Sequence, residues 1–207
     1  EIMPSLVGSE MCIRDRYYLS ASVLYRMLDN LSFSLSTDGS INTMNANLNE
    51  FAQPTRYSWL TAFAGKYMND WLTISASALA TIINEDVKEG GSAGNHRKLT
   101  PYISASFKPF YHEEFRIRFF YKDIFRLPSF NDLYYQEVGN TKLRPENARQ
   151  YNVGLTYSKN VCPFLPYLSA TIDAYYNKVT DKIIAYPTKN LAVWSMRNLG
   201  EVEIKGI

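Results

Sequence analysis

The feature that most constrains this chain is a run in which apolar and small polar side chains alternate one by one. In residues 72–82, Leu, Ile and Ala occupy every second position, and Thr and Ser fill most positions between them. A helix would place apolar residues three and four apart, whereas a strand sends successive side chains to opposite faces. The run is therefore predicted to be a strand with one apolar and one polar face.

The same period of two recurs along the chain and predicts an all-β fold. In the sixth such run, aromatic and aliphatic residues alternate with Glu114, Arg116, Arg118 and Lys122. Unpaired charges cannot face a dry core, so this face is predicted to line a polar or water-filled lumen. The nine expected strands are residues 17–26, 31–36, 57–67, 72–82, 99–107, 114–122, 151–157, 168–177 and 197–207.

The connections alternate between short and long. Short turns at 28–30 and 69–70 are followed by long polar segments at 37–55 and 85–97, and this order continues to the end of the chain. A Greek-key sandwich does not require such alternation, whereas an up-and-down outer-membrane barrel has short turns at one end and long loops at the other. Strands in lipid must also close into a barrel. The expected fold is an antiparallel up-and-down transmembrane β-barrel.

Composition agrees with a barrel and excludes other classes. The 16 Tyr and 11 Phe residues suit aromatic girdles at both membrane interfaces. No apolar run reaches the roughly 18 residues of a membrane helix, which excludes a helical membrane protein. The net charge of +2 comes without a basic stripe, so no nucleic-acid partner is predicted. Cys12 and Cys162 are isolated and have neither metal-ligand nor redox spacing.

The longest connection carries an ordered set of motifs. FRLPSFNDLYY (125–135) is followed by GNTKL (139–143) and RPENARQYNVGLTY (144–157). This block resembles the one in the barrel of TonB-dependent outer-membrane receptors, where an FRxPS-x-x-x-LY box precedes a GN-x-x-L-x-PE box and a YxxGL strand. The last segment, RNLGEVEIKGI (197–207), resembles the strand that follows in these receptors.

The resemblance implies a 22-stranded barrel closed by an N-terminal plug, of which this chain would supply about nine strands. Such receptors import scarce nutrients such as ferric siderophores, cobalamin, haem or glycans, with energy from the TonB–ExbB–ExbD complex. The expected setting is lipid of a Gram-negative outer membrane, and the Asn- and Tyr-rich composition suggests a Bacteroidetes-like source. The plug, the TonB-contacting box and the C-terminal strand are expected to lie outside this sequence.

The first residues are expected to be foreign to the protein. EIMPSLVGSEMCIRDR, residues 1–16, resembles translated sequencing-adapter read-through and lacks the apolar centre and cleavage site of a signal peptide. We expect residues 17–207 to be a partial receptor barrel that begins inside a strand.

Two groups of residues are candidates for ligand contact. Aromatic rings offer stacking surface and polar tips, although they could equally form the outer girdle or pack loop against loop. Inward-facing cations could steer an anionic ligand or pair with acidic residues of a plug. The ring candidates are Phe130, Tyr134, Tyr135, Tyr186 and Trp194, and the cationic candidates are Arg116 and Arg118.

The remaining motif residues are expected to be structural, and Glu146 is expected to be free to pair with an arginine. No histidine lies between Phe125 and Leu143, which argues against haem; His96 is expected in a long loop and His112 on a short turn. No cofactor or metal site is predicted. The residues expected to be structural are Phe125, Arg126, Pro128, Asn140, Leu143, Pro145, Glu146 and Gly154.

Two other readings of the strand pattern remain open at this point. One is a complete small outer-membrane barrel, either a porin or an enzyme, and the other is a soluble β-sandwich binding module. The chain has no GxSxG elbow and no metal-spaced His or Cys cluster. It is therefore not predicted to be an enzyme.

Overall fold

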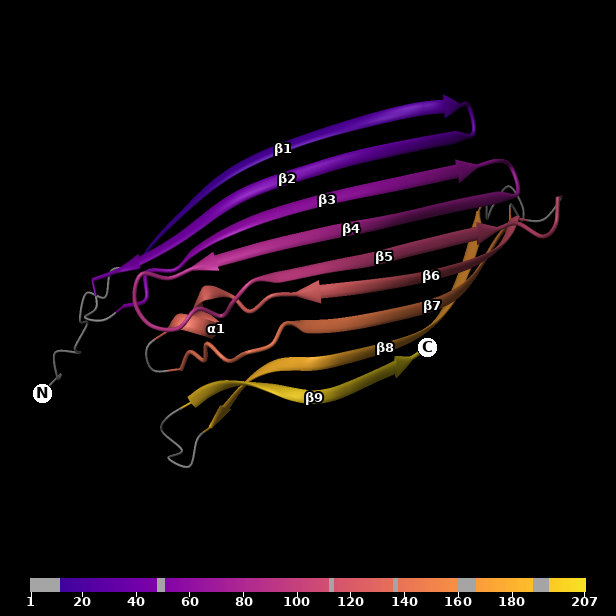
Figure 1. Ribbon diagram of the computed structural model, residues 1–207. Helices are drawn as coiled ribbons and strands as arrows, with labels where there is room; N and C mark the ends of the chain where they lie inside the picture. Colours follow the sequence, from indigo (N-terminus) through magenta and orange to yellow (C-terminus); the bar gives the residue numbers. More distant parts are fainter. Residues whose placement is uncertain (1–11, 48–50, 112–113, 136–137, 160–166, 188–193) are drawn as a thin grey trace, which may run out of the picture.

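The computed structural model describes residues 12–47, 51–111, 114–135, 138–159, 167–187 and 194–207. In these residues nine strands form one antiparallel sheet in chain order, so the predicted all-β, up-and-down arrangement is confirmed (Figure 1). The strands are β1 Cys12–Leu28, β2 Leu31–Ala46, β3 Thr55–Met68, β4 Leu72–Asp86, β5 His96–Phe107, β6 Glu114–Arg126, β7 Glu146–Lys159, β8 Leu168–Pro187 and β9 Trp194–Gly206.

Short and long connections lie at opposite ends of the sheet, as predicted (Figure 1). Asp29–Asn30 and 69–71 join strands at one end. The longer connections, including residues 127–145 between β6 and β7, lie at the other end. Among the described residues, no helix is long and apolar enough to cross a membrane.

Several strands are longer than predicted. β2 continues through polar residues to Ala46, and β7 begins at Glu146 rather than Tyr151. The predicted loops 37–55 and 85–97 are accordingly too long, because backbone pairing between β2 and β3 extends to Thr43 opposite Thr55. Near the loop end polar side chains occupy both faces of these strands, so apolar and polar residues do not alternate there. A prediction based on alternation therefore ended these strands too early. β1 begins at Cys12, and the assignment of residues 1–16 to a leader stays a prediction.

The pairing register separates the two faces. Arg118 lies opposite Gly154, which lies opposite Asp173, so these residues share the polar face. Val153 and Ile172 lie on the other face, where they are 51% and 63% exposed. Large exposed apolar surfaces need an apolar environment or a partner. The chain therefore has the two-faced construction of a membrane barrel wall.

One ladder is shorter than its neighbours. β5 and β6 pair only from Tyr102 opposite Lys122 to Phe107 opposite Ile117, although both strands continue toward the loop end. The next residue of β5 is Pro101, which has no N–H to donate. The ladder thus ends beside a residue that cannot continue it.

The two faces predict unequal effects of adding a charge. Val153→Lys, on the apolar face, should lower the free energy of unfolding of the full-length protein in lipid vesicles by about 2–4 kcal/mol. Asn152→Lys, one residue away on the polar face, should change it by less than about 1 kcal/mol. Urea titration of the protein measures both values. Equal costs at the two positions would contradict the assignment of faces.

Candidate functional site

The candidate site is built around the connection between β6 and β7, residues 127–145, here called the signature loop. Within it, α1 (Phe130–Tyr134) lies at the end of the sheet that carries the long connections (Figure 1). The helix contacts Arg56 of β3 and Glu85 of β4, which the register places on the same face as Arg118. The signature loop therefore folds back over the polar face.

Sequence analysis predicted no helix here, because five residues are too few to show a helical period. The start of α1 is nevertheless marked in the sequence by a capping box. The Ser129 hydroxyl accepts from the Asp132 amide at 3.2 Å, and the Asp132 carboxylate accepts from the Ser129 amide at 2.8 Å. Ser at the N-cap with an acidic residue three positions later is the local signal that was overlooked.

The helix packs into a small apolar core at the loop end of the sheet. Phe130 and Tyr134 supply two of its rings, and Leu143 of the GNTKL motif lies beside them. Residues from four connections or strand ends meet here, which joins distant parts of the chain. The buried members of this loop core are Met44, Phe51, Phe130, Leu133, Tyr134, Leu143 and Ile183.

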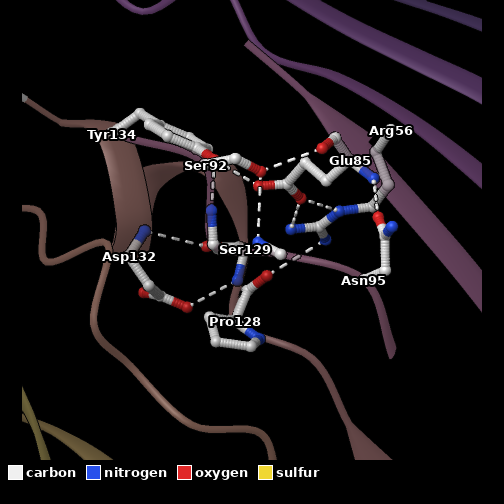
Figure 2. Close-up of polar contacts among 10 residues, drawn as sticks. Arg56, Glu85, Ser92, Asn95, Pro128, Ser129, Asp132 and Tyr134 are labelled. Carbon is white, nitrogen blue, oxygen red and sulfur yellow. Dashed lines mark hydrogen bonds and ion pairs between the residues drawn. The ribbon is translucent and has the colours of Figure 1, made fainter. Parts of the chain in front are cut away.

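A buried polar network holds α1 to the sheet (Figure 2). Arg56 donates from Nε and Nη2 to Glu85 Oε2, each at 2.6 Å, and from Nη1 to the Pro128 carbonyl at 3.0 Å. The Glu85 side chain is 2% exposed and accepts a further hydrogen bond from the Tyr134 hydroxyl. An ion pair this buried needs all of its partners, because losing one leaves an uncompensated charge.

Tyr134 remains a hydrogen-bond donor throughout the physiological pH range. Burial, followed by its bond to Glu85, raises the pKa of the Tyr134 phenol to about 12. The same hydroxyl accepts from the Ala93 amide at 3.2 Å, which ties the β4–β5 connection to α1. The Arg56 guanidinium also lies 4.7 Å from the Phe130 ring centroid.

The Arg56–Glu85 pair was not identified from the sequence, although a signal for it exists. Counting outward from the turn at 69–71, antiparallel pairing brings Arg56 directly opposite Glu85. Opposite charges at directly paired positions stabilise a sheet. The sequence analysis placed Glu85 in a loop and so did not consider it as a strand partner.

Glu146 lies in a second group of polar contacts, where β6 ends and β7 begins. Its side chain, 7% exposed, accepts from Arg126 Nη1 at 3.0 Å and from the Ile183 amide at 2.5 Å. Lys182 Nζ lies 3.5 Å from the same carboxylate. Arg126 of the FRLP motif (125–128) and Glu146 of the RPE motif (144–146) thus meet where β6 ends and β7 begins. Glu146 also binds β8 near the loop end of that strand.

The GNTKL motif attaches the loop to β9. Asn140 donates from Nδ2 to the Met196 carbonyl at 3.0 Å. A Cβ on Gly139 would lie 2.6 Å from the Tyr135 carbonyl oxygen, so only glycine fits there. Arg144 contacts Asp181 at 2.5 Å, and Asn198 donates to the Arg144 carbonyl at 2.8 Å.

Gly154 makes room for an ion pair that crosses β7. Arg118 of β6 contacts Asp173 of β8 at 2.9 Å, with the two side chains 41% and 37% exposed. A Cβ on Gly154 would collide with Asp173 Oδ1. Since Asp173 partly neutralises Arg118, this arginine is less available to an anionic ligand than Arg116.

The structure separates the ligand-contact candidates. Phe130 and Tyr134 are buried in the loop core, which favours the packing role left open above. Tyr135, Tyr186 and Trp194 are 44%, 49% and 49% exposed at the loop end. Arg116 and Arg118 lie at least eight residues along β6 from Arg126, roughly 26 Å toward the short turns. One small ligand therefore cannot contact both sets in this arrangement.

The other motif positions have structural contacts. Pro128 is fully buried, and the Phe125 ring lies 6.4 Å from that of His96, which is the first residue of β5 rather than part of a loop. His112 and Cys162 lie outside the described residues. Within the part of the chain that the structure describes, no three His, Cys, Asp or Glu side chains gather closely enough to hold a metal ion.

Comparison with known proteins identifies the family. The model of the TonB-dependent receptor-like β-barrel matches residues 16–207. The chain belongs to this family of outer-membrane receptors of Gram-negative bacteria, as the resemblance predicted. The soluble β-sandwich is therefore wrong.

Curated relatives include two vitamin B12 transporters named BtuB. The protein from Vibrio vulnificus is 27% identical across 98% of this chain and 36% of its own length. The protein from Photobacterium profundum is 32% identical across 40% of this chain and 13% of its own length. The chain thus spans about a third of the first relative. The matched proteins are transporters and receptors, not enzymes.

Solved structures share the fold. The copper transporter OprC superposes with a TM-score of 0.72 at 12% identity, covering 94% of this chain and 34% of that structure. A double mutant of the Serratia marcescens hemophore receptor HasR, solved with its hemophore HasA and heme, gives 0.71 at 13% identity, covering 94% and 39%. These likenesses show the barrel fold alone.

The buried network predicts that one hydroxyl holds the signature loop in place. Tyr134→Phe leaves Glu85 Oε1 and the Ala93 amide without this partner, at a cost of about 1–3 kcal/mol. Hydrogen exchange of the α1 amides in the full-length receptor should accelerate on the order of 10-fold or more. Tyr135→Phe, on a neighbouring ring that is 44% exposed, serves as the control and should leave the exchange unchanged. Equal exchange in both variants would show that the network does not hold the loop.

Proposed function

We propose that this chain is part of the wall of an outer-membrane receptor that binds a scarce nutrient and imports it with energy from the TonB–ExbB–ExbD complex. The observation that carries the proposal is the family match over residues 16–207 together with the signature loop anchored on the polar face. A wall with lipid on its apolar face leaves the polar face for a plug and for the ligand. Residues 17–207 are then part of the barrel domain, and the plug belongs to another part of the receptor.

The anchored loop favours a receptor over a passive pore. The signature loop places α1 over the polar face. It is tied to β3 through the Pro128 carbonyl and Arg56, to β4 through Tyr134 and Glu85, and to β9 through Asn140 and the Met196 carbonyl. An inward-folded rigid loop narrows the passage at the loop end. A barrel of this kind admits a selected solute rather than a free flow of small molecules.

For the ligand class we propose a metal chelate or corrinoid, such as a ferric siderophore or cobalamin. Both BtuB relatives are vitamin B12 transporters, which supports the corrinoid. The cationic Arg116 on the polar face supports an anionic chelate. The relatives come from Vibrio and Photobacterium, and they give no support to a Bacteroidetes-like source.

Among the ligand-contact candidates, the exposed rings at the loop end are the ones we propose to meet the ligand first. Tyr135, Tyr186 and Trp194 are exposed at the loop end of the sheet, and the flat faces of such rings suit a corrin or a catecholate. The Arg197 guanidinium lies 5.4 Å from the Tyr186 ring centroid, so this ring sits beside a positive charge.

The test is uptake by cells. The full-length receptor is expressed in a Gram-negative host strain that lacks its own receptors for cobalamin and ferric siderophores. Uptake of labelled cyanocobalamin and of ferric siderophores is then measured with and without TonB. We expect saturable uptake of one ligand that disappears without TonB. Trp194→Ala should weaken binding of that ligand on the order of 10-fold. Phe130→Ala, the buried control, should lower the amount of folded receptor and leave the affinity of the folded fraction unchanged.

Two results would contradict these proposals. Uptake that is unsaturable and independent of TonB would identify a passive pore and overturn the receptor proposal. A Trp194→Ala receptor with unchanged affinity would remove this ring from the ligand site while leaving TonB-dependent transport intact.

A further inference from the structure

The polar face of the wall is divided into two sectors in the half nearer the short turns. On β2–β5 its side chains are mostly Ser, Thr and Ala, as in the row where Ser34 lies opposite Ala64 and Ala64 opposite Ser77. On β6–β8 the same face carries long side chains, among them Arg116 and Lys122. The two sectors therefore differ in how closely another polypeptide can approach the sheet.

A cavity lies in the sector of short side chains. Its volume is about 250 Å³, and its lining includes Ala64 and the side chains of Ser32, Ser34, Ser75 and Ser77, so we call it the serine cavity. No described residue forms a hydrogen bond with these four hydroxyls. A serine hydroxyl can both donate and accept hydrogen bonds. The serine cavity thus offers unused polar groups and close approach to the sheet.

Two cations lie at the serine cavity. Lys66 lines this cavity and also an adjoining one of about 620 Å³ at the β1–β2 turn, which Arg26 lines as well. Arg26 and Lys66 both lie opposite Ser32, one on each neighbouring strand. Neither cation forms an ion pair within the part of the chain that the structure describes. By charge complementarity, this surface fits a partner that brings a carboxylate to Lys66.

The sector of β6–β8 is less suited to close packing. The side chains of Arg118 and Asp173 are 41% and 37% exposed although they form an ion pair. Arg116 and Lys122 form no ion pair with any of the described residues. Ordering a long Lys or Arg side chain costs more conformational entropy than packing against Ala, which has no rotamers to lose. A polypeptide therefore packs more favourably at the serine cavity, and the charged sector keeps its water.

We propose that the plug of the receptor docks on the serine cavity with a carboxylate at Lys66, and that the ligand passes between the plug and the charged sector of β6–β8. The inference rests on the proposed function, from which it takes the plug and the import of a ligand. The chain spans 36% of the first BtuB relative, and the proposed function places the plug in another part of the receptor. Along the charged sector, Arg116 and Lys122 attract an anionic solute.

The experiment compares how fast a water-soluble maleimide reacts with single cysteines in the two sectors. Ser75→Cys and Asn152→Cys are a matched pair, because Ser104 and Phe120 link them in one row of the sheet and both are half-buried in this chain. The full-length receptor, with its natural cysteines replaced by serine, is labelled in isolated outer membranes. We expect Asn152→Cys to react on the order of 10-fold faster. After unfolding in urea, the two should react equally.

Charge variants test the contact at Lys66. Lys66→Glu sets a carboxylate against that of the plug, and it should raise the labelling rate of Ser75→Cys to about that of Asn152→Cys. Lys66→Arg keeps the charge and should preserve the protection. Lys122→Glu, a charge reversal in the other sector, is the matched control and should leave the labelling of Ser75→Cys unchanged.

The outcomes separate this inference from the proposed function. Equal labelling of the two positions in the folded receptor, or protection of Ser75→Cys that survives Lys66→Glu, would overturn the inference even if uptake still depends on TonB. Uptake by the wild-type receptor that does not depend on TonB would instead overturn the proposed function.

Discussion

The structure depends on the pairing of backbone groups along nine strands of which one face is apolar and uncovered. A strand in lipid has no water to satisfy its N–H and C=O groups, so each group must find a partner in a neighbouring strand. The register from β1 to β9 provides those partners between neighbouring described strands, except where the β5–β6 ladder stops at Tyr102 opposite Lys122 and at the outer edges of β1 and β9. Once the backbone is paired, the choice of side chain at alternate positions decides which face meets lipid and which meets the lumen.

The second constraint is the position of the signature loop. A loop that folds over a polar face exposes backbone and charged groups, and it stays there only if its contacts are specific. Here the Pro128 carbonyl and the Tyr134 hydroxyl bind the buried Arg56–Glu85 ion pair, and α1 packs into a small apolar core. A second ion pair, Arg126 with Glu146, joins the two strand ends between which the loop runs. Because one member of each pair is almost fully buried, losing its partner is costly. The motifs that define the family in this segment are therefore largely the residues that anchor the loop.

Much of this arrangement could be predicted from the sequence, for a physical reason. Alternation is strong wherever a strand has lipid on one side, and so the strands and their faces, including the charged face of β6, followed from the residues. The same signal fades at the loop end, where both faces of a strand meet polar surroundings. There the sequence analysis ended β2 too early, started β7 too late and missed α1.

The site was predicted less completely, because its contacts join residues far apart in the sequence. An arginine partner for Glu146 could be expected from its motif, whereas the contacts of Arg56 and Glu85 require the register of two strands to be known to their ends. Phe130 and Tyr134 were assigned to a loop, and a loop residue is expected to be exposed. Their burial depends on Met44 and Phe51, which no local pattern connects to α1.

The central claim is that this sheet is a barrel wall with lipid on one face and an aqueous lumen on the other. Its most direct test is a spin-label scan of β7 from Arg149 to Tyr157 in the full-length receptor in lipid vesicles, with accessibility to oxygen and to a water-soluble nickel complex measured at each position. The account predicts strict alternation, with oxygen reaching labels at Tyr151, Val153 and Leu155 and nickel reaching those at Gln150, Asn152 and Thr156. Labels that show no alternation, or the opposite one, would contradict it.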